Sequence, residues 1–267
     1  SLDRLSVVFT DPASFSVDAD KGMYRPLLVT TYALNHAVGN FDVTGYHAVN
    51  IAIHLGNAVL VWWLAGLLGA GVRGRLLAGL LFAVHPVAGE PVNYISSRIE
   101  SLAALFYLLG LCLFLHGASR PWPWRLGVWV STAAGLFTKS TVFTLPAVLL
   151  VCDYLLLSGA DPRRLRRRWK THHLPAWGVA AGYLVIVTGN RWLLRSLEQD
   201  VRGPLEQLLT QAKGLLYYLH LLTLPTHLSV EPQFFVLGSA SVLVVSLSMA
   251  LSAVGGAVAL WRGRGRR

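Results

Sequence analysis

Charged residues are scarce in this sequence, and acidic ones are the scarcest. Only 13% of its 267 residues are charged, against roughly 25% in soluble domains, whereas 54% are hydrophobic. Asp and Glu together number 13 and Lys and Arg 23, which gives a formal net charge of +10. The shortage of charge excludes an ordinary soluble domain and indicates a polytopic membrane protein.

Cysteine, metal-binding motifs and a leader segment are also lacking. The two cysteines, Cys112 and Cys152, lie inside apolar runs, where they act as small hydrophobes, so no disulfide framework is expected. No HExxH arrangement occurs, and a proline and a glycine break the helical register between His85 and Glu90, so we expect no metal site. The chain opens at Ser1 without a basic signal segment, and we expect it to be truncated at both ends.

Long apolar runs fill most of the chain. A bilayer span needs about 20 apolar residues, and the runs predict an all-α, polytopic transmembrane helical bundle of about seven spans. The spans are expected at 43–69, 76–84, 101–116, 126–137, 142–157, 175–194 and 237–261. Two further segments, 24–38 and 205–224, are expected to form interfacial or re-entrant helices. A single domain follows, with 1–42 as external loop and interfacial helix, 43–261 as the bundle and 262–267 as a basic cytoplasmic tail.

Basic residues gather in two short segments of the chain. Arginines and a lysine crowd 163–170, and four more arginines lie in 262–267. By the positive-inside rule both segments are cytoplasmic, where they are attracted to anionic lipid headgroups rather than to nucleic acid. His172 and His173 then belong to a solvated cytoplasmic loop.

The same rule fixes the opposite face of the membrane. Counting spans outward from the basic segments places 1–42, the 85–100 stretch, Lys139 and the residues around Arg191 on the external side. We therefore expect an integral membrane protein of the bacterial inner membrane whose active face is external.

Polar residues mark one stripe of the first expected span. His47, Asn50, His54 and Asn57 follow one another at spacings of three, four and three, which places them on one face of a helix. Such a stripe either faces a polar cavity or forms hydrogen bonds between helices, and both interpretations stay open.

A second group of polar residues interrupts two apolar runs between Leu81 and Leu102. The stretch LFAVHPVAGEPVNYISSRIESL carries His85, Glu90, Asn93, Tyr94, Arg98 and Glu100. In a membrane protein such groups are tolerated where they line a cavity or an aqueous face, so this stretch is the first candidate for the working site. Arg98 is expected either to contact a ligand or to pair with Glu90 or Glu100.

Five segments occur in an order that resembles a known family. They are YRPLLVTTYALNHAVG, GYHAVNIAIHLGNAVL, LLFAVHPVAGEPVNYISSRIESLAALFYL, GLFTKSTVFTLPAVLLVCDYLL and KGLLYYLHLLTLPTHLSVEP. Together they resemble the transmembrane part of the protein O-mannosyltransferases that carry tetratricopeptide repeats, and of their bacterial relatives, which are C-type glycosyltransferases. The spaced His-Pro-Val, Pro-Val and Ser-Arg pattern is the most specific part of this likeness.

The resemblance implies an inverting glycosyltransferase. Such an enzyme moves a sugar, here possibly mannose, from a polyprenyl-phosphate donor to a protein or other acceptor at the external membrane face. The acceptor hydroxyl needs a carboxylate within reach, and the departing phosphate needs fixed positive charge. The implied partners are membrane lipids, the lipid-linked sugar, and a protein acceptor or a larger membrane complex; no cofactor beyond the donor is implied.

Several positions of this sequence match the motifs of that family. The residues that the resemblance assigns to phosphate or substrate are Arg98, Lys139, Arg25, Tyr24 and His85, with Arg191 in reserve; His47, Asn50 and His54 form the polar stripe; and Asp11, Glu90 and Glu100 are weaker candidates for the catalytic acid. The acidic pair that the family uses is expected upstream of Ser1.

Two departures from the family favour an alternative function. The acidic pair is not in this sequence, and Ser140 stands where the family commonly has an acidic residue after the lysine. The alternative is a catalytically silent, glycosyltransferase-like subunit that acts as a membrane scaffold. A transporter or channel is disfavoured, because the sequence shows no internal repeat and no acidic run in a span.

Overall fold

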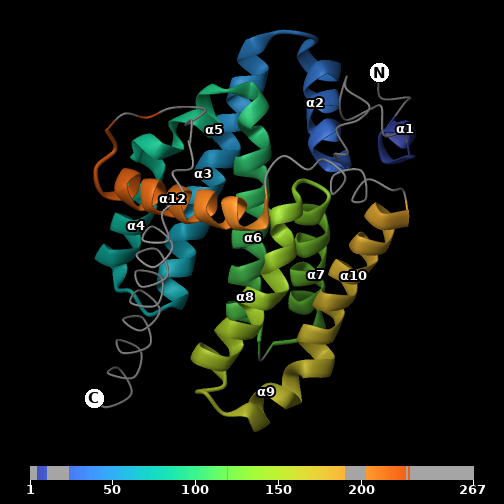
Figure 1. Cartoon of the computed structure of the whole chain (residues 1–267), viewed down its shortest axis with the longest axis vertical. Helices are drawn as coiled ribbons and strands as arrows, with labels where there is room; N and C mark the ends of the chain where they lie inside the picture. Colours follow the sequence, from blue (N-terminus) through green and yellow to red (C-terminus); the bar gives the residue numbers. More distant parts are fainter. Residues whose placement is uncertain (1–4, 11–23, 119, 190–202, 227, 229–267) are drawn as a thin grey trace. The chain divides into compact units, whose positions relative to one another are not determined.

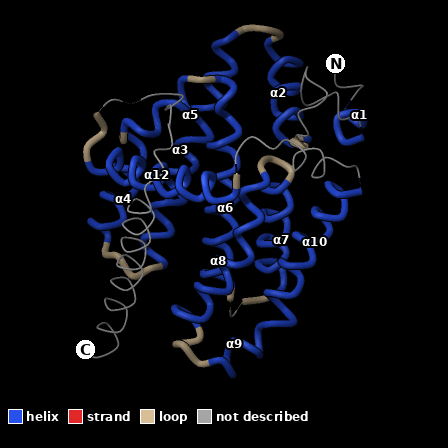
Figure 2. Tube along the Cα trace, viewed as in Figure 1, coloured by secondary structure: helices blue, strands red, loops and turns tan. Residues whose placement is uncertain are grey.

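The computed structural model describes residues 5–10, 24–118, 120–189, 203–226 and 228. The chain divides into two compact units, Ser1–Glu198 and Gln199–Arg267, and each is treated by itself. The described residues form helices and turns without a strand, which confirms the predicted all-α class (Figure 1, Figure 2).

Helix α6 lies at the centre of the first unit, packed against α3 on one side and α7 on the other, while α4 packs on α3 and α10 on α7. The helices of this unit are α1 (Leu5–Thr10), α2 (Pro26–Gly39), α3 (Val43–Leu67), α4 (Val72–Val84), α5 (Gly89–Asn93), α6 (Arg98–Gly117), α7 (Trp122–Leu136), α8 (Leu145–Cys152), α9 (Pro162–Arg168) and α10 (Leu174–Gly189). Short helical turns join them: η3 (Pro86–Ala88), η4 (Ile95–Ser97), η5 (Ser140–Thr144), η6 (Asp153–Leu157) and η7 (Trp169–His173).

Local sequence sets the ends of these helices. Asp42 caps α3, since its side chain accepts a hydrogen bond from the Thr44 backbone N–H at 3.0 Å. Helix α4 ends before His85, which has an extended backbone, because the following Pro86 disfavours a helical conformation there. Proline then occupies the first turn of η3, where its missing N–H costs nothing.

The apolar core of the first unit joins α6, α7, α8 and α10. Its buried members are Ala103, Phe114, Val128, Leu136, Val142, Leu145, Leu149 and Ala180. Two glycines allow the backbones to approach closely: a Cβ on Gly135 would lie 2.7 Å from a methyl of Val142, and one on Gly110 would lie 2.9 Å from a methyl of Leu145. Small residues at such contacts are typical of helices that pack in a membrane.

Three of the described helical segments are long and apolar enough to cross a membrane. They are Val43–Leu67, Ile95–Gly117 and Ser140–Leu157. Helix α4 and the turn that follows it, bent by 50°, make a fourth candidate if they cross as one broken span. The expected count of about seven spans is therefore not confirmed in the part of the chain that the structure describes.

The polar stretch between the second and third expected spans is a sharp break, as predicted. Helix α4, the turn η3, the short helix α5 and the turn η4 follow one another before α6 begins at Arg98. The Tyr94 backbone N–H returns to the Glu90 carbonyl at 2.9 Å, and the Ser97 N–H to the Tyr94 carbonyl at 3.1 Å. These turns satisfy backbone groups that an open loop would leave unpaired.

The arginine-rich segment differs from the expected solvated loop. It is helical, with α9 capped by Asp161, whose side chain accepts from the Arg163 N–H at 2.9 Å. The prediction that His172 and His173 are solvated is wrong, because the two residues are 6% and 1% exposed. The cause is the buried carboxylate of Asp153, which requires nearby donors and draws His173 into the bundle.

The described part of the second unit consists mainly of helix α12 (Pro204–Thr223). Its bounds agree with the helix predicted at 205–224, and Pro204 occupies the first turn, where a proline is tolerated. The last expected span, 237–261, and the basic tail lie outside the described residues.

Candidate functional site

The first turn of α6 divides the predicted site residues into two groups. Arg98 and Glu100 are two residues apart, which is roughly 200° around a helix, so their side chains leave α6 in opposite directions. Arg98 extends toward α2 and α3, whereas Glu100 meets Lys139 after α7. Two neighbouring sequence positions therefore serve two separate sites.

Arg98 is enclosed in the seam between α2, α3 and α6. Its residue is 0% exposed, and its guanidinium donates hydrogen bonds to Asn50 Oδ1 at 2.7 Å and to Asn35 Oδ1 at 2.7 Å. Further bonds reach Thr31 Oγ1 at 3.3 Å and the Tyr46 carbonyl at 3.0 Å. These four acceptors are all neutral.

Two aromatic rings complete the enclosure of the guanidinium. The Cζ of Arg98 lies 4.6 Å from the ring centre of Tyr32 and 5.6 Å from that of Tyr46. Ring faces attract a cation through their quadrupole, so they offset part of the cost of burying its charge. The Tyr32 hydroxyl donates to the Ile95 carbonyl at 2.7 Å, which ties the ring to the turn before α6.

The expected pairing of Arg98 with Glu90 or Glu100 is wrong. Glu90 accepts a hydrogen bond from the Ser97 hydroxyl at 3.0 Å, and Glu100 forms an ion pair with Lys139. The helical angle between positions 98 and 100 explains why proximity in sequence did not become contact in space. Arg98 instead orders three helices through amide and carbonyl oxygens.

The polar stripe of α3 forms hydrogen bonds between helices for most of its length. Asn50 donates to the Tyr94 carbonyl at 3.2 Å, and Asn57 donates to the Ser101 carbonyl at 2.8 Å. The His54 Nε2 lies 3.0 Å from the Ala83 carbonyl, at the end of α4. The second of the two open interpretations therefore holds for these three side chains, which fasten α3 to α4, the break and α6.

His47 has a different environment from the rest of the stripe. It lines an open pocket of about 620 Å³ together with Tyr32, Asn93, Tyr94, Ile95 and Ser96. Tyr94 is 51% exposed, so the pocket presents an aromatic side chain and several polar groups to its surroundings.

A second cluster joins Lys139, Glu100 and Arg25. Lys139 Nζ and the Glu100 carboxylate form an ion pair, with side chains 24% and 49% exposed. Arg25 lies close enough to Glu100 for the two charges to interact. Three positions that the family resemblance had singled out thus meet between the start of α2, the first turn of α6 and the end of α7.

The backbone around this cluster is held by direct contacts between α2 and α7. The Leu27 N–H donates to the Phe137 carbonyl at 3.1 Å, and the Tyr24 ring meets the Phe137 ring edge-on at 6.0 Å. Burial lowers the pKa of the Arg25 guanidinium, and the charge of Glu100 opposes that shift. An arginine stays protonated at neutral pH under such a shift, so the cluster carries two cations and one anion.

An apolar groove opens beside the cluster. Its volume is about 370 Å³, and its lining consists of Phe82, Glu100, Ala103, Ala104, Tyr107, Leu108, Thr141 and Val142. Glu100 is the charged member of this lining, and its partner Lys139 directly precedes η5. The groove is therefore apolar apart from Glu100, whose carboxylate pairs with Lys139.

The remaining predicted site residues either have a structural role or lie outside the described residues. His85 ends α4, and its Nδ1 accepts a hydrogen bond from the Val87 N–H at 3.3 Å. Asp11 and Arg191 lie outside the described residues. Cys112 and Cys152 are free thiols, and the described residues contain no group of side chains that could hold a metal ion.

Two contributors to the Arg98 seam were missed in the sequence. Thr31 and Asn35 lie four residues apart on the same face of α2 and both accept from the guanidinium. A polar pair at this spacing within an apolar helix was a readable signal of a buried polar partner. The carbonyl of Tyr46, a backbone group, had no such signal.

Fold and site together define a helical membrane protein with a cluster of charged residues beside an apolar groove. Among curated proteins, the chain is 34% identical over 137 residues to protein O-mannosyl-transferase TMTC2 of Mus musculus, covering 49% of this chain and 16% of that protein. It is 36% identical over 155 residues to protein O-mannosyl-transferase Tmtc2 of Drosophila melanogaster, covering 54% and 16%. It is 33% identical over 156 residues to protein O-mannosyl-transferase TMTC4 of Homo sapiens, covering 50% and 21%.

These similarities confirm the resemblance to the transmembrane part of the repeat-carrying protein O-mannosyltransferases. The chain spans about a sixth of the length of the TMTC2 proteins that it matches. No family profile matches the chain, and no solved structure gives a significant match.

Proposed function

We propose that this protein is a membrane glycosyltransferase that moves a sugar, mannose by resemblance, from a polyprenyl-phosphate donor to a protein acceptor at the external membrane face. One observation carries the proposal: Glu100 lines an apolar groove, pairs with Lys139 and interacts with the charge of Arg25, which suits an amphiphilic phosphate. The named activity of the similar proteins supports it.

The groove suits the isoprenyl chain of such a donor. Its walls are Phe82, Tyr107, Leu108 and Val142, and two alanines leave room between them. Burying each methylene of a lipid chain gains about 0.8 kcal/mol. The phosphate would then lie at the charged end of the groove, beside Lys139.

The cations at that end have a defined role in the transfer. The acceptor oxygen forms a bond to the anomeric carbon, and the bond from that carbon to the phosphate oxygen breaks with its electron pair on the phosphate. Lys139 and Arg25 would stabilise the negative charge that develops on this leaving group. The acceptor proton passes to a carboxylate base, for which the resemblance implies the acidic pair of the first external loop.

Glu100 would hold Lys139 in position until the donor arrives. Its carboxylate is engaged by Lys139, which suits it to orienting a cation rather than to removing a proton from the acceptor. In this proposal Arg98 acts through the seam that it builds, and it positions α6 so that Glu100 faces the groove.

The full-length native protein offers the direct test. Incubated in detergent with polyprenyl-phosphate mannose and acceptor peptides, it should release polyprenyl phosphate and form mannosylated peptide. Donors carrying other sugars test the assignment of mannose. An absence of turnover with every donor sugar would exclude a glycosyltransferase.

A second candidate is the catalytically silent membrane subunit. The ion pair of Lys139 with Glu100 favours it, because a lysine that already has a carboxylate partner needs no ligand. This candidate predicts stable co-purification with a partner complex and no binding of a polyprenyl-phosphate donor. Donor binding without turnover would separate a silent relative that retains its lipid site from a scaffold without one.

Narrowing the groove should select against long donor chains. Ala104→Phe places a large side chain in the lining, and we expect KM to rise about tenfold for a long polyprenyl donor, the equivalent of about two lost methylene contacts. A short, water-soluble isoprenyl analogue should keep its KM within about twofold, because it does not extend along the groove.

The matched control is Ala65→Phe in α3, at a half-buried alanine outside the groove lining. It should alter neither KM. An equal rise for both donors in Ala104→Phe would show general damage to the protein, and unchanged values would place the lipid chain elsewhere.

A further inference from the structure

The end of the first unit that carries α9 has far more positive than negative charge. Its basic residues are Arg120, Arg125, Arg163, Arg164, Arg166, Arg167, Arg168 and Lys170. Among the described residues, Asp153 and Asp161 are the carboxylates that pair with cations here. Both have structural tasks, so most of the positive charge at this end remains uncompensated.

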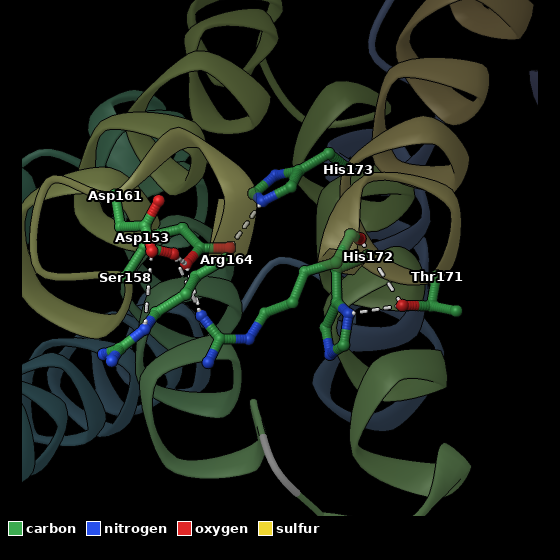
Figure 3. Close-up of polar contacts among 8 residues, drawn as sticks. Asp153, Ser158, Asp161, Arg164, Thr171, His172 and His173 are labelled. Atoms are coloured by element: carbon green, nitrogen blue, oxygen red, sulfur yellow. Dashed lines mark hydrogen bonds and ion pairs between the residues drawn. The ribbon is translucent and has the colours of Figure 1, made fainter. Parts of the chain in front are cut away.

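Asp153 fastens the basic helix to the bundle. Its carboxylate is 0% exposed and lies 2.6 Å from an Arg168 guanidinium nitrogen and 2.8 Å from His173 Nε2. The Ser158 hydroxyl donates to it at 2.7 Å. Figure 3 shows the His173 ring pointing toward the Asp153 carboxylate. Three contacts to one buried carboxylate hold α9 and η7 in a defined place.

The other cations of α9, and Lys170 at the start of η7, face outward. Arg163, Arg166, Arg167 and Lys170 are exposed, and no carboxylate within the described part of the chain pairs with them. Arg164 lies 3.7 Å from Asp161, with both side chains largely exposed. Because α9 is fixed from behind by Arg168, these side chains form a cationic surface of stable position.

Beside this surface lie two buried nitrogens without hydrogen-bond partners. They are His172 Nε2 and Arg125 Nε, on η7 and on the first turn of α7. His172 is only 6% exposed, and Figure 3 shows its ring directed away from Asp153. A buried polar atom without a partner costs about 1–3 kcal/mol, which a bound acceptor group would remove.

His172 contributes a hydrogen-bonding group rather than a charge. Burial lowers its pKa to about 4, and the charges of Arg125, His173 and Arg168 add to the shift, so the ring is neutral at pH 7. The Thr171 hydroxyl lies 2.9 Å from His172 Nδ1. The same hydroxyl also lies 3.4 Å from the Arg168 carbonyl, and in the tautomer in which it donates to the nearer Nδ1 the ring proton sits on Nε2, available to an anionic oxygen.

We propose that this end of the protein binds the phosphate of an anionic phospholipid headgroup, held by Arg125 and His172 and surrounded by the exposed arginines of α9. The charge surplus and the unpartnered nitrogens of Arg125 and His172 favour an anion. The surface also carries exposed apolar residues suited to the lipid boundary, Trp169 and Leu174 at 40% and 54% exposure. This site is independent of the transfer chemistry and lies at the opposite end of α6 and α7 from Lys139.

Native mass spectrometry of the full-length protein in detergent tests the proposal, with phosphatidylglycerol as the probe. Arg125→Gln should weaken binding about fivefold, and the double variant Arg163→Gln/Arg167→Gln about 25-fold. These values assume that each basic residue near an anionic lipid strengthens binding by about fivefold. His172→Phe retains a ring against Phe114 but removes both nitrogens, and should weaken binding about tenfold.

His172→Phe is the decisive variant, because a neutral side chain affects binding only if it contacts the headgroup. The matched control is Arg73→Gln, an exposed arginine at the start of α4 outside the cluster, which should bind normally. Phosphatidylcholine should bind at least tenfold more weakly than phosphatidylglycerol, and inorganic phosphate more weakly still.

Four outcomes would overturn the proposal. Equal binding of both phospholipids would exclude recognition of the anionic headgroup. Equal loss in Arg73→Gln and Arg125→Gln, or unchanged binding in a folded His172→Phe, would reduce the effect to diffuse charge. Phosphate binding as tight as phosphatidylglycerol would assign the site to free anions.

Discussion

Arg98→Gln should destabilise the protein by about 3 kcal/mol, the largest stability effect that we expect from a single substitution. The shorter side chain cannot reach the oxygens of Asn50 and Asn35 together, so buried acceptors on α2 and α3 lose their donor. Each unsatisfied buried group costs about 1–3 kcal/mol. The loss falls on the seam that joins α2, α3 and α6.

Thermal unfolding of the purified protein in detergent measures this effect. A loss of about 3 kcal/mol should lower Tm by about 6–12 °C for a chain of this size. Arg98→Lys keeps the charge but not the planar fork, so it should recover only part of the loss. Arg73→Gln, at an exposed position, should leave Tm unchanged.

The same variants separate a structural role for Arg98 from direct phosphate binding. If Arg98 contacted the donor, Arg98→Gln would raise KM for the donor and leave Tm close to that of the native protein. Its complete burial among neutral acceptors favours the structural outcome.

Lys139→Gln should reduce kcat of the proposed transfer about 100- to 1000-fold. Removing one preorganised donor to a developing negative charge typically has an effect of this size. Lys139 pairs with Glu100, which lines the groove, and its side chain is partly exposed, so a phosphate can reach it. Release of polyprenyl phosphate by the full-length protein, followed under saturating donor, gives kcat directly.

Two further variants make the Lys139 result specific. Lys139→Arg keeps the positive charge and should retain more activity than Lys139→Gln. Lys170→Gln removes a lysine from the opposite, arginine-rich end and should leave kcat unchanged. Full activity in Lys139→Gln would show that the donor phosphate does not bind at this cluster. It would contradict the proposed binding of the donor along the groove.

The helices and their order could be predicted because they follow from chain chemistry alone. Apolar runs with few charges set the positions of α3 and α6, and prolines set the break after α4. The bounds of α2 and α12 agree closely with the expected interfacial segments. Each of these signals acts between residues that are near one another in sequence.

The partners of the charged residues could not be predicted in this way. Glu90 and Glu100 both offered plausible pairings with Arg98, yet the ion pair that forms joins Glu100 to Lys139. The guanidinium of Arg98 instead meets amides on two other helices. Which face of α6 meets which neighbour depends on how helices pack around it, and helix packing involves contacts that no local pattern encodes.

The burial of His172 and His173 could not be predicted from local sequence either. Beside a run of arginines they had the composition of a solvated loop, and the tertiary structure buries both. Asp153 explains the difference, because a carboxylate inside the bundle is stable only with donors around it. That requirement arises from the position of Asp153 in the fold.

The sequence by itself thus determined the membrane class, the helical content, the polar break before α6 and the likeness to protein O-mannosyltransferases, because composition, periodicity and motif order are properties of the chain. Only the tertiary structure decided that Arg98 is buried and joins three helices, and that Glu100 pairs with Lys139 beside an apolar groove. It also decided that His172 and His173 are buried beside a cationic helix. The physical reason is that a side chain's role depends on its dielectric environment and its partners, and both are set by segments distant in sequence.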